Sequence, residues 1–338
     1  MHVAVGAQEQ VRAALAAANA ETASPKDRAE MLMEIALGLQ IRPKSADDLV
    51  AAVELYGKAQ DICPPTHALL NARIAARKAT ALQAIPENGT ESLEHARDEF
   101  QTAIPCIRDL GTSEELAEAE MNLGLVLQSL AGAGKARITD AISAYQRSLR
   151  TFDRVAFPKE YAILQNNLAT AFLSIPFTDE RAKMREALAV QAFEEGLKVV
   201  TLIDHPTEYA MLQNNLGNAL QYASSSHVLE NNLRAIEAYD EALKIRDRET
   251  TPLEYANTIS NKANCLWNLP DDVGDPSSGN RKNVADAREL YVEAREIFSA
   301  AGEQAKARIV AEALDQIDRE LLARAGLRIS NGHMLEAD

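Results

Sequence analysis

One short pattern recurs six times along the 338-residue sequence: a small residue, an aromatic residue four positions later, and another small residue three positions after that. The sets are Ala52, Tyr56, Ala59; Ala96, Phe100, Ala103; Ala141, Tyr145, Ser148; Ala189, Phe193, Gly196; Ala235, Tyr239, Ala242; and Ala287, Tyr291, Ala294. These spacings put the three residues on one stripe of an α-helix, where small residues let a neighbouring backbone approach and the ring fills the space between them. The pattern predicts six equivalent helices, which we name the B helices.

A second pattern precedes each B helix. Its clearest copies are PKEYAILQNNLATAF, PTEYAMLQNNLGNAL and PLEYANTISNKANCL, which begin at Pro158, Pro206 and Pro252, and SEELAEAEMNLGLVL, which begins at Ser113. A helix tolerates proline in its first turn, and apolar residues three or four positions apart mark one helical face. These predicted A helices each carry a small residue that allows a close crossing: Ala36, Ala75, Gly124, Ala169, Gly217 and Ala263. Each repeat is therefore predicted to be a hairpin of an A helix and a B helix.

At these positions residues 25–300 resemble the tetratricopeptide repeat (TPR). The resemblance implies an all-α fold, a right-handed α-solenoid of six TPR-like hairpins. The first alanines of successive B helices lie 44 to 52 residues apart, against about 34 residues in the standard repeat. The units are therefore expanded, and they resemble those of bacterial TPR proteins that carry a QNNLGNAL sequence.

The remaining segments are predicted from their local composition. Residues 1–24 are expected to contain an Ala-rich N-terminal helix, and residues 301–326 an amphipathic helix that caps the apolar face of the last repeat. Residues 327–338 are expected to form a disordered tail. The long connection that starts at Pro270, PDDVGDPSSGNRKN, is predicted to be a mobile loop.

Charge and hydropathy exclude several classes of partner. A formal net charge of −15 makes binding to nucleic acid or to anionic lipid unfavourable, so neither partner is expected. No segment approaches the apolar length of a membrane span, and the N-terminal stretch lacks a signal-peptide pattern, so a cytoplasmic protein without membrane insertion is expected. Cys63, Cys106 and Cys265 lie far apart and outside any CxxC spacing, and we interpret them as packing residues.

No catalytic or metal-binding pattern is found in the sequence. The stretch AGAGKARIT around Lys135 lacks the first glycine of a phosphate loop and has Ala136 where serine or threonine would bind magnesium. No histidine pair has metal-ligand spacing. The acids Glu194 and Glu195 fit a solvated helix face, and the acidic loop after Pro270 lacks the calcium-loop pattern. A noncatalytic chain without a cofactor or metal is therefore predicted.

A recurring asparagine marks the candidate binding surface, because the TPR resemblance implies that the A helices line the groove of the superhelix. The position before the motif's leucine is asparagine in four consecutive repeats: Asn122, Asn167, Asn215 and Asn261. We name these four residues the asparagine ladder. An asparagine amide offers donors and an acceptor, so the ladder could pair with successive peptide groups of an extended chain. It resembles the ladder in the TPR superhelix of O-linked N-acetylglucosamine transferase. The first two repeats have Glu34 and Arg73 instead.

Other polar and aromatic residues fall in the same groove by their register. They are Asn166, Asn214, Asn218, Gln221, Tyr222, Asn257, Asn264 and Trp267. Two interpretations stay open at this point: the amides either contact a ligand or hydrogen-bond within and between repeats. The single tryptophan, Trp267, either anchors a partner or packs under the loop that follows it.

These features predict a noncatalytic adaptor or scaffold that binds a peptide segment or a partner protein in the groove of its C-terminal four repeats. Two alternatives remain: a ligand-responsive regulatory sensor, and an accessory subunit of a separate enzyme. The identity of the partner does not follow from the sequence.

Overall fold

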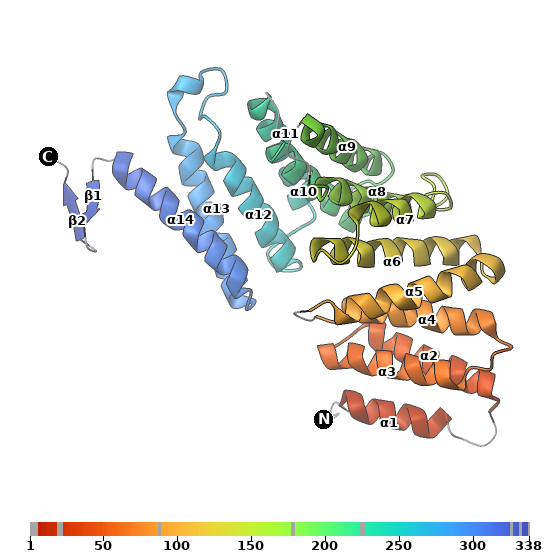
Figure 1. Ribbon diagram of the computed structural model, residues 1–338. Coiled ribbons are helices and arrows are strands. Elements are labelled where there is room, and N and C mark those ends of the chain that lie inside the picture. Colours follow the sequence, from red (N-terminus) through yellow and green to blue (C-terminus); the bar gives the residue numbers. More distant parts are fainter. Residues whose placement is uncertain are drawn as a thin grey trace. The chain divides into compact units, whose positions relative to one another are not determined.

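The computed structural model of the chain describes residues 6–18, 23–86, 89–176, 180–223, 227–324, 327–330 and 333–336. The chain divides into two compact units, residues 1–175 and residues 176–338. The first unit contains α1 (Ala7–Ala18), α2 (Pro25–Ile41), α3 (Ala46–Ile62), α4 (Ala68–Ala84), α5 (Glu91–Leu110), α6 (Ser113–Gly132), α7 (Ile138–Ser148) and α8 (Pro158–Leu173). These elements are labelled in Figure 1.

The second unit consists mainly of helices as well. It contains α9 (Glu180–Leu197), α10 (Pro206–Gln221), α11 (Val228–Leu243), α12 (Pro252–Trp267), a 3-10 turn (Pro276–Ser278), α13 (Arg281–Ala300) and α14 (Gln304–Arg324). Two short strands follow, β1 (Leu327–Ser330) and β2 (His333–Glu336). The order of elements is the predicted alternation of A helices (α2, α4, α6, α8, α10, α12) and B helices (α3, α5, α7, α9, α11, α13).

The A helices begin where the sequence supplies helix-start residues. Helices α8, α10 and α12 have proline in their first turn, as predicted. Helix α6 begins with a capping box in which Thr112 Oγ1 accepts from the backbone N–H of Glu115 at 3.2 Å and the Glu115 carboxylate accepts from the backbone N–H of Thr112 at 3.0 Å. These bonds satisfy backbone donors that a helix start otherwise leaves unpaired.

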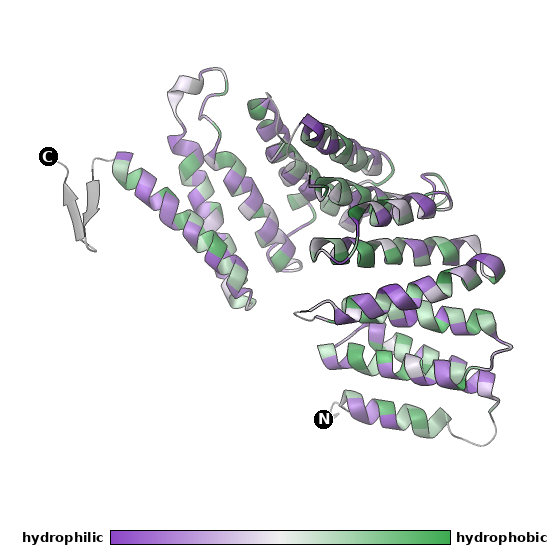
Figure 2. Cartoon of the chain, viewed as in Figure 1, coloured by the Kyte–Doolittle hydropathy of each residue, from purple (hydrophilic) through white to green (hydrophobic). Residues whose placement is uncertain are grey.

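Within each unit, consecutive helices pack against one another as in an α-solenoid. The pairs α2/α3, α4/α5 and α6/α7 form hairpins in the first unit, and α10/α11 and α12/α13 do so in the second. Helix α1 packs on the first hairpin and α14 packs on α13. Hydrophobic residues gather along one side of many of these helices in Figure 2, which is the pattern that stacked amphipathic helices require. The predicted all-helical solenoid with a capping helix is confirmed.

The B-helix aromatic residues are buried in their units. Tyr56, Phe100, Tyr145, Phe193 and Tyr239 are 0% exposed, and Tyr291 is 5% exposed. A Cβ atom added at Gly124 would lie 2.4 Å from Cε1 of Tyr145, and one added at Gly217 would lie 2.6 Å from Cε1 of Tyr239. Carbon atoms need about 3.5 Å. The small A-helix residue therefore makes room for the ring, as the sequence predicts.

Two features of the fold differ from the expectations. The boundary between the units falls between α8 and α9, which belong to one predicted repeat. The segment expected to be a disordered tail contains β1 and β2, which pair antiparallel from Leu327 opposite Glu336 to Ser330 opposite His333. The sequence carries a hairpin signal at this place, because an Asn-Gly pair at 331–332 separates the two strands.

Candidate functional site

Two of the predicted groove amides contact a B-helix tyrosine. The hydroxyl of Tyr239 on α11 lies 2.8 Å from Asn218 Oδ1 and 2.8 Å from Gln221 Oε1 on α10. Tyr145 donates its hydroxyl proton to Gln128 Oε1 at 2.8 Å, which is the corresponding contact in the third repeat. A buried phenol needs such an acceptor. The side-chain oxygens of Asn218 and Gln221 therefore have a structural role.

The same contact occurs in the first repeat, whereas the sixth repeat has Tyr291 in its B helix and Trp267 at the corresponding A-helix position. Tyr56 donates to Gln40 Oε1 at 2.7 Å. In the first, third and fifth repeats the glutamine stands four positions after the small A-helix residue, and the B-helix ring is tyrosine. In the second repeat the ring is Phe100 and the position holds Ala79. Because phenylalanine has no hydroxyl, no acceptor is required there.

In the second unit the ladder asparagines lie within a row of amides that links α12 to α10. Asn261 Nδ2 lies 3.5 Å from Asn214 Oδ1, a long hydrogen bond, and Asn214 Nδ2 donates to Asn215 Oδ1 at 3.2 Å. Asn257 lies one turn before Asn261 and is half-buried. These amides hydrogen-bond partly to each other. For this part of the ladder, the contacts support the interpretation that the amides hydrogen-bond within and between repeats.

The aromatic residues predicted for the groove also contact neighbouring repeats. Tyr222, which is exposed at the end of α10, accepts a hydrogen bond from Asn264 Nδ2 at 2.9 Å. Trp267 donates its indole N–H to Glu320 Oε2 on α14 at 3.0 Å. The indole thus contacts the capping helix, a contact that neither interpretation of Trp267 included.

In the first unit, Asn166 and Asn167 are buried on α8, with 8% and 7% of their surface exposed. Asn166 Nδ2 donates to Asn167 Oδ1 at 3.2 Å. Asn167 Nδ2 makes no hydrogen bond within the described part of the chain. An unpaired buried amide is costly, by about 1–3 kcal/mol. A ligand could bind this nitrogen only if the side chain turned out of its buried position.

Asn122 differs from the other ladder residues because it lines an open cavity. This cavity, of about 240 Å³, lies over the A helices α2, α4 and α6. Its charged and polar lining includes Gln40, Arg73, Arg77, Thr80, Glu115, Glu118 and Asn122. The side chain of Asn122 forms no hydrogen bond within the described ranges of the chain. The structure therefore brings this ladder residue together with charges of the first two repeats, which the sequence had left outside the site.

Two arginines of this lining form ion pairs between adjacent repeats. Arg73 contacts Glu115 through two hydrogen bonds of 2.7 and 3.2 Å, and Arg77 Nη1 lies 3.0 Å from Glu34 Oε1. The hydrogen bond from Arg73 lowers the pKa of Glu115, with the backbone N–H of Thr112 and the charges of Arg73 and Arg77 acting in the same direction against partial burial. The pairs place both signs of charge around the neutral amide of Asn122.

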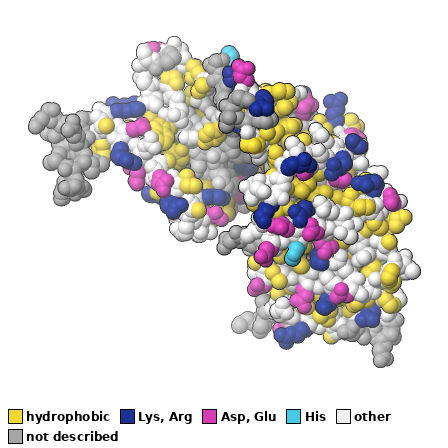
Figure 3. All heavy atoms as spheres, in the orientation of Figure 1, with side chains coloured by type: hydrophobic (Ala, Val, Ile, Leu, Met, Phe, Trp, Pro, Cys, Tyr) yellow, Lys and Arg dark blue, Asp and Glu magenta, His cyan; other side chains and the backbone are white. Residues whose placement is uncertain are grey.

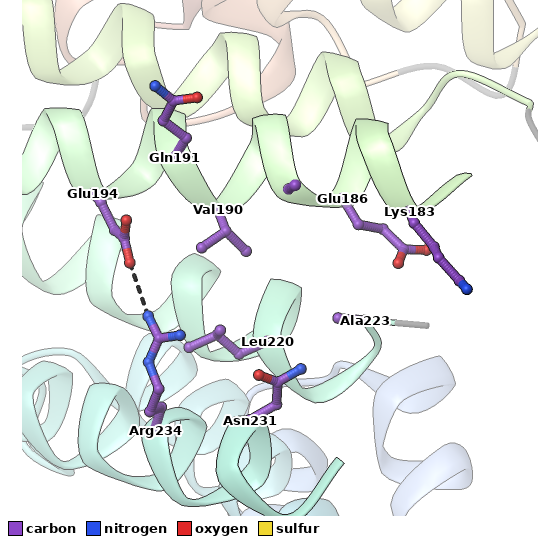
Figure 4. Close-up of a pocket in the computed structure, with 10 residues that line it drawn as sticks. Lys183, Glu186, Val190, Gln191, Glu194, Leu220, Ala223, Asn231 and Arg234 are labelled. Atoms are coloured by element: carbon purple, nitrogen blue, oxygen red, sulfur yellow. Dashed lines mark hydrogen bonds and ion pairs between the residues drawn. The ribbon is translucent and has the colours of Figure 1, made fainter. Parts of the chain in front are cut away.

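A second cavity, not predicted from the sequence, lies between α9 and α11 in the second unit. It measures about 520 Å³. In Figure 4, Val190 and Leu220 project into the space between the helices, and Arg234 on α11 reaches Glu194 on α9 at 2.8 Å. Its lining is Lys183, Glu186, Ala187, Val190, Gln191, Glu194, Leu220, Ala223, Asn231 and Arg234. The sequence contains one indication of this cavity: its lining residues on α9 stand three and four positions apart, which places them on one face of the helix.

Other features of the described residues limit the chemistry of the surface. Charged side chains of both signs are interspersed over the face shown in Figure 3. Within the described ranges, no group of three or more His, Cys, Asp or Glu side chains could hold a metal ion. The Asp271 carboxylate accepts from the backbone N–H groups of Lys282 and Asn283, both at 2.9 Å, and these bonds lower its pKa. This acid therefore caps α13. No helix of the described segments is long and apolar enough to cross a bilayer.

Comparison with known proteins supports the fold. No protein-family model matches the sequence, and no curated protein matches it. Among solved structures, the chain is similar to a signal transduction ATPase with numerous domains (STAND) from Pyrococcus horikoshii that has a tetratricopeptide repeat sensor, with 15% identity and a TM-score of 0.56. The match covers 90% of this chain and 42% of that protein, so the chain spans less than half of its length.

Two further structures show weaker similarity. BtubC (BKLC) from P. vanneervenii matches with 16% identity and a TM-score of 0.40, covering 100% of both chains. A Rap protein complexed with Competence and Sporulation Factor matches with 13% identity and a TM-score of 0.42, covering 94% of this chain and 87% of that chain. These two TM-scores are too low to bear on the fold. The similarity to the STAND protein supports a TPR-like helical repeat fold.

Proposed function

We propose that the chain is a noncatalytic adaptor that binds a peptide segment or a partner protein on the A-helix faces of its repeats. Within the first unit these faces belong to α4, α6 and α8, and within the second to α10 and α12. One observation carries the proposal: the amide of Asn122 is unpaired within the described residues and lines the 240 Å³ cavity over the A helices. A side-chain amide in that position can pair with both groups of a peptide backbone.

The ion pairs around Asn122 favour a peptide ligand over a purely apolar one. Arg73 and Glu115 are each partly exposed, at 42% and 31% of their side-chain surface, and can exchange one partner for another. An extended peptide offers carbonyl and N–H groups at a regular spacing, together with side chains that could replace one member of a pair. Of the other ladder residues, Asn261 links the A helices α12 and α10 through its contact with Asn214.

The test begins with affinity purification of the full chain from its native cell, which identifies a partner by mass spectrometry. The affinity of that partner is then measured by calorimetry for the wild type, for Asn122→Ala, and for the triple variant with Asn167, Asn215 and Asn261 changed to Ala. Loss of one peptide-amide hydrogen bond costs about 1 kcal/mol, so Asn122→Ala is expected to weaken binding by about fivefold.

The matched control is Asn231→Ala, which removes an amide from the α9/α11 cavity and not from an A helix. We expect this variant to bind like the wild type. The proposal is wrong if the partner binds both ladder variants with unchanged affinity while their circular dichroism spectra show intact folding.

A second candidate function, a ligand-responsive sensor, is favoured by the α9/α11 cavity. Its volume of about 520 Å³ and its apolar floor at Val190 and Leu220 lie in the range of small-molecule sites. Small molecules released from the purified protein by heat would be identified by mass spectrometry. An extract without any bound compound, or X-ray scattering that does not change at a saturating concentration of a released compound, would count against a sensor.

A further inference from the structure

A polar cavity of about 460 Å³ lies at the C-terminal end of α12, against the capping helix α14. Six residues line it: Asn264, Trp267, Asn268, Asn280, Gln316 and Glu320. Five of them carry an amide or carboxylate group, and the sixth is the only tryptophan of the chain. All six belong to the second unit.

The hydrogen bonds within the cavity each use one N–H group of a lining side chain. Asn268 Nδ2 donates to the backbone oxygen of Asn264 at 2.8 Å, and Asn280 Nδ2 donates to the backbone oxygen of Trp267 at 2.8 Å. Because a carbonyl oxygen can only accept, both amides must turn their nitrogen toward it. The indole N–H is likewise taken up, by Glu320 Oε2 at 3.0 Å.

Several oxygens of the lining are unpaired among the described residues, beside the second N–H groups of the amides. Oδ1 of Asn264, Oδ1 of Asn268 and Oε1 of Glu320 accept no hydrogen bond from any described residue. Glu320 adds a formal negative charge, and the indole ring adds an electron-rich face that attracts cations. A cavity with free oxygens, a carboxylate and an indole ring suits a ligand that has several N–H donors and a positive charge.

The chain itself places a guanidinium group, that of Arg324, at the edge of this cavity. Arg324, the last residue of α14, donates from Nη1 to Asn280 Oδ1 at 2.8 Å, and its Nη2 lies 3.8 Å from Glu320 Oε2. Its side chain keeps 47% of its surface exposed. The guanidinium of Arg324 therefore hydrogen-bonds to one lining oxygen and forms an ion pair with a second, while the remaining free oxygens can accept from another cationic group.

We propose that this cavity binds the ammonium or guanidinium group of a Lys or Arg side chain from the partner segment. The proposal rests on the proposed adaptor function and names the chemistry of its ligand. The net charge of −15 acts in the same direction, since it attracts a basic partner. Arg324 competes for Glu320 and thereby limits the affinity of the site for the incoming cation.

The test uses the intrinsic fluorescence of Trp267 in the full-length chain. The probes are the tripeptides Gly-Lys-Gly and Gly-Arg-Gly, both N-acetylated and C-amidated, with Gly-norleucine-Gly blocked in the same way as the uncharged control. We expect a saturable fluorescence change with the two basic peptides in the millimolar range, weakened by salt, and no saturable change with the norleucine peptide.

Two variants of the cavity have opposite expected effects. Glu320→Gln keeps an oxygen for the indole N–H but removes the charge, and it should weaken basic-peptide binding about tenfold. Arg324→Gln removes the internal competitor and should tighten binding by up to about fivefold. Glu312→Gln is the matched control, because Glu312 lies on α14 outside the cavity lining and pairs with Arg308 at 3.9 Å.

The proposal is overturned if neither basic peptide gives a saturable change, if norleucine binds equally well, or if Glu320→Gln and Glu312→Gln behave alike. These outcomes are separable from failure of the adaptor function. Loss of peptide binding together with a partner complex that still depends on Asn122 would refute only the cation site. Peptide binding that depends on Glu320, together with a partner complex insensitive to Asn122, would refute only the A-helix surface.

Discussion

The substitution Gly124→Ala tests the close contact between a glycine and a tyrosine ring in the third repeat, which recurs at Gly217 in the fifth. The added methyl group would lie 2.4 Å from Cε1 and 2.6 Å from Cδ1 of Tyr145. Carbon atoms separate to about 3.5 Å or more, so the ring must move by roughly 1 Å. Movement away from α6 also stretches the 2.8 Å hydrogen bond from the tyrosine hydroxyl to Gln128, which lies on the same helix as Gly124.

Three contributions determine the size of the effect. Overpacking a core position costs about 1–3 kcal/mol, and a lost hydrogen bond costs about 1 kcal/mol. Alanine offsets part of this cost, because it is favoured over glycine inside a helix by about 1 kcal/mol. We therefore expect Gly124→Ala to lower the free energy of unfolding by about 1–3 kcal/mol.

The matched control is Gly38→Ala in α2, which lies in the same unit. An added Cβ at Gly38 has no atom within 4 Å, so only the helix preference remains. We expect this variant to be more stable than the wild type by about 1 kcal/mol. The two identical chemical changes thus have opposite predicted signs.

The assay is urea unfolding of the full chain followed by circular dichroism at the helix band, with hydrogen exchange of α6 and α7 as a local measurement. Exchange resolves the stability of one segment even when the chain does not unfold in a single step. A Gly124→Ala protein as stable as Gly38→Ala, with unchanged exchange in α6, would refute the packing account.

Two further predictions concern cysteine reactivity and pH. Burial raises the pKa of the Cys265 thiol to about 12. We therefore expect iodoacetamide at pH 8 to modify the partly exposed Cys106 first and to leave Cys265 unmodified until the chain unfolds. Equal rates of modification at the two cysteines would contradict this prediction. Because Arg73 lowers the pKa of Glu115 below 4.5, this carboxylate contributes stability that is fully present above pH 4.5 and is lost as the pH falls through its folded-state value. The difference in unfolding free energy between wild type and Glu115→Gln should therefore be at most about 1 kcal/mol at pH 7 and should disappear in acid. A difference that grows in acid would show that the predicted direction of the pH dependence is wrong.

The repeat architecture could be predicted because its determinants lie within single helices. The spacing of Ala141, Tyr145 and Ser148 identifies one helical stripe, and Gly124 identifies the place that receives the ring. The tyrosine–glutamine contacts were also readable, because glutamine accompanies tyrosine and alanine accompanies phenylalanine in the first three repeats. For Gln221 this association favours the second of the two interpretations left open by the sequence, a hydrogen bond within the repeat.

The remaining features depend on how one repeat sits on the next. Arg73 and Glu115 are 42 residues apart, and their contact requires the actual offset of α4 relative to α6. The cavity between α9 and α11 depends in the same way on the separation of two B helices, which the spacing within each helix does not determine. The division of the chain between α8 and α9 has no local composition signal that we recognise.

The central claim is that a partner binds on the A-helix faces, and hydrogen exchange of the full chain with and without its purified partner tests this most directly. We predict slower backbone exchange in α4 and α6, around Asn122, with little change in α9 and α11. Bound peptide should reduce the local opening of the helices that it contacts. Protection confined to α9 and α11, or no protection at a saturating concentration of partner, would contradict the account.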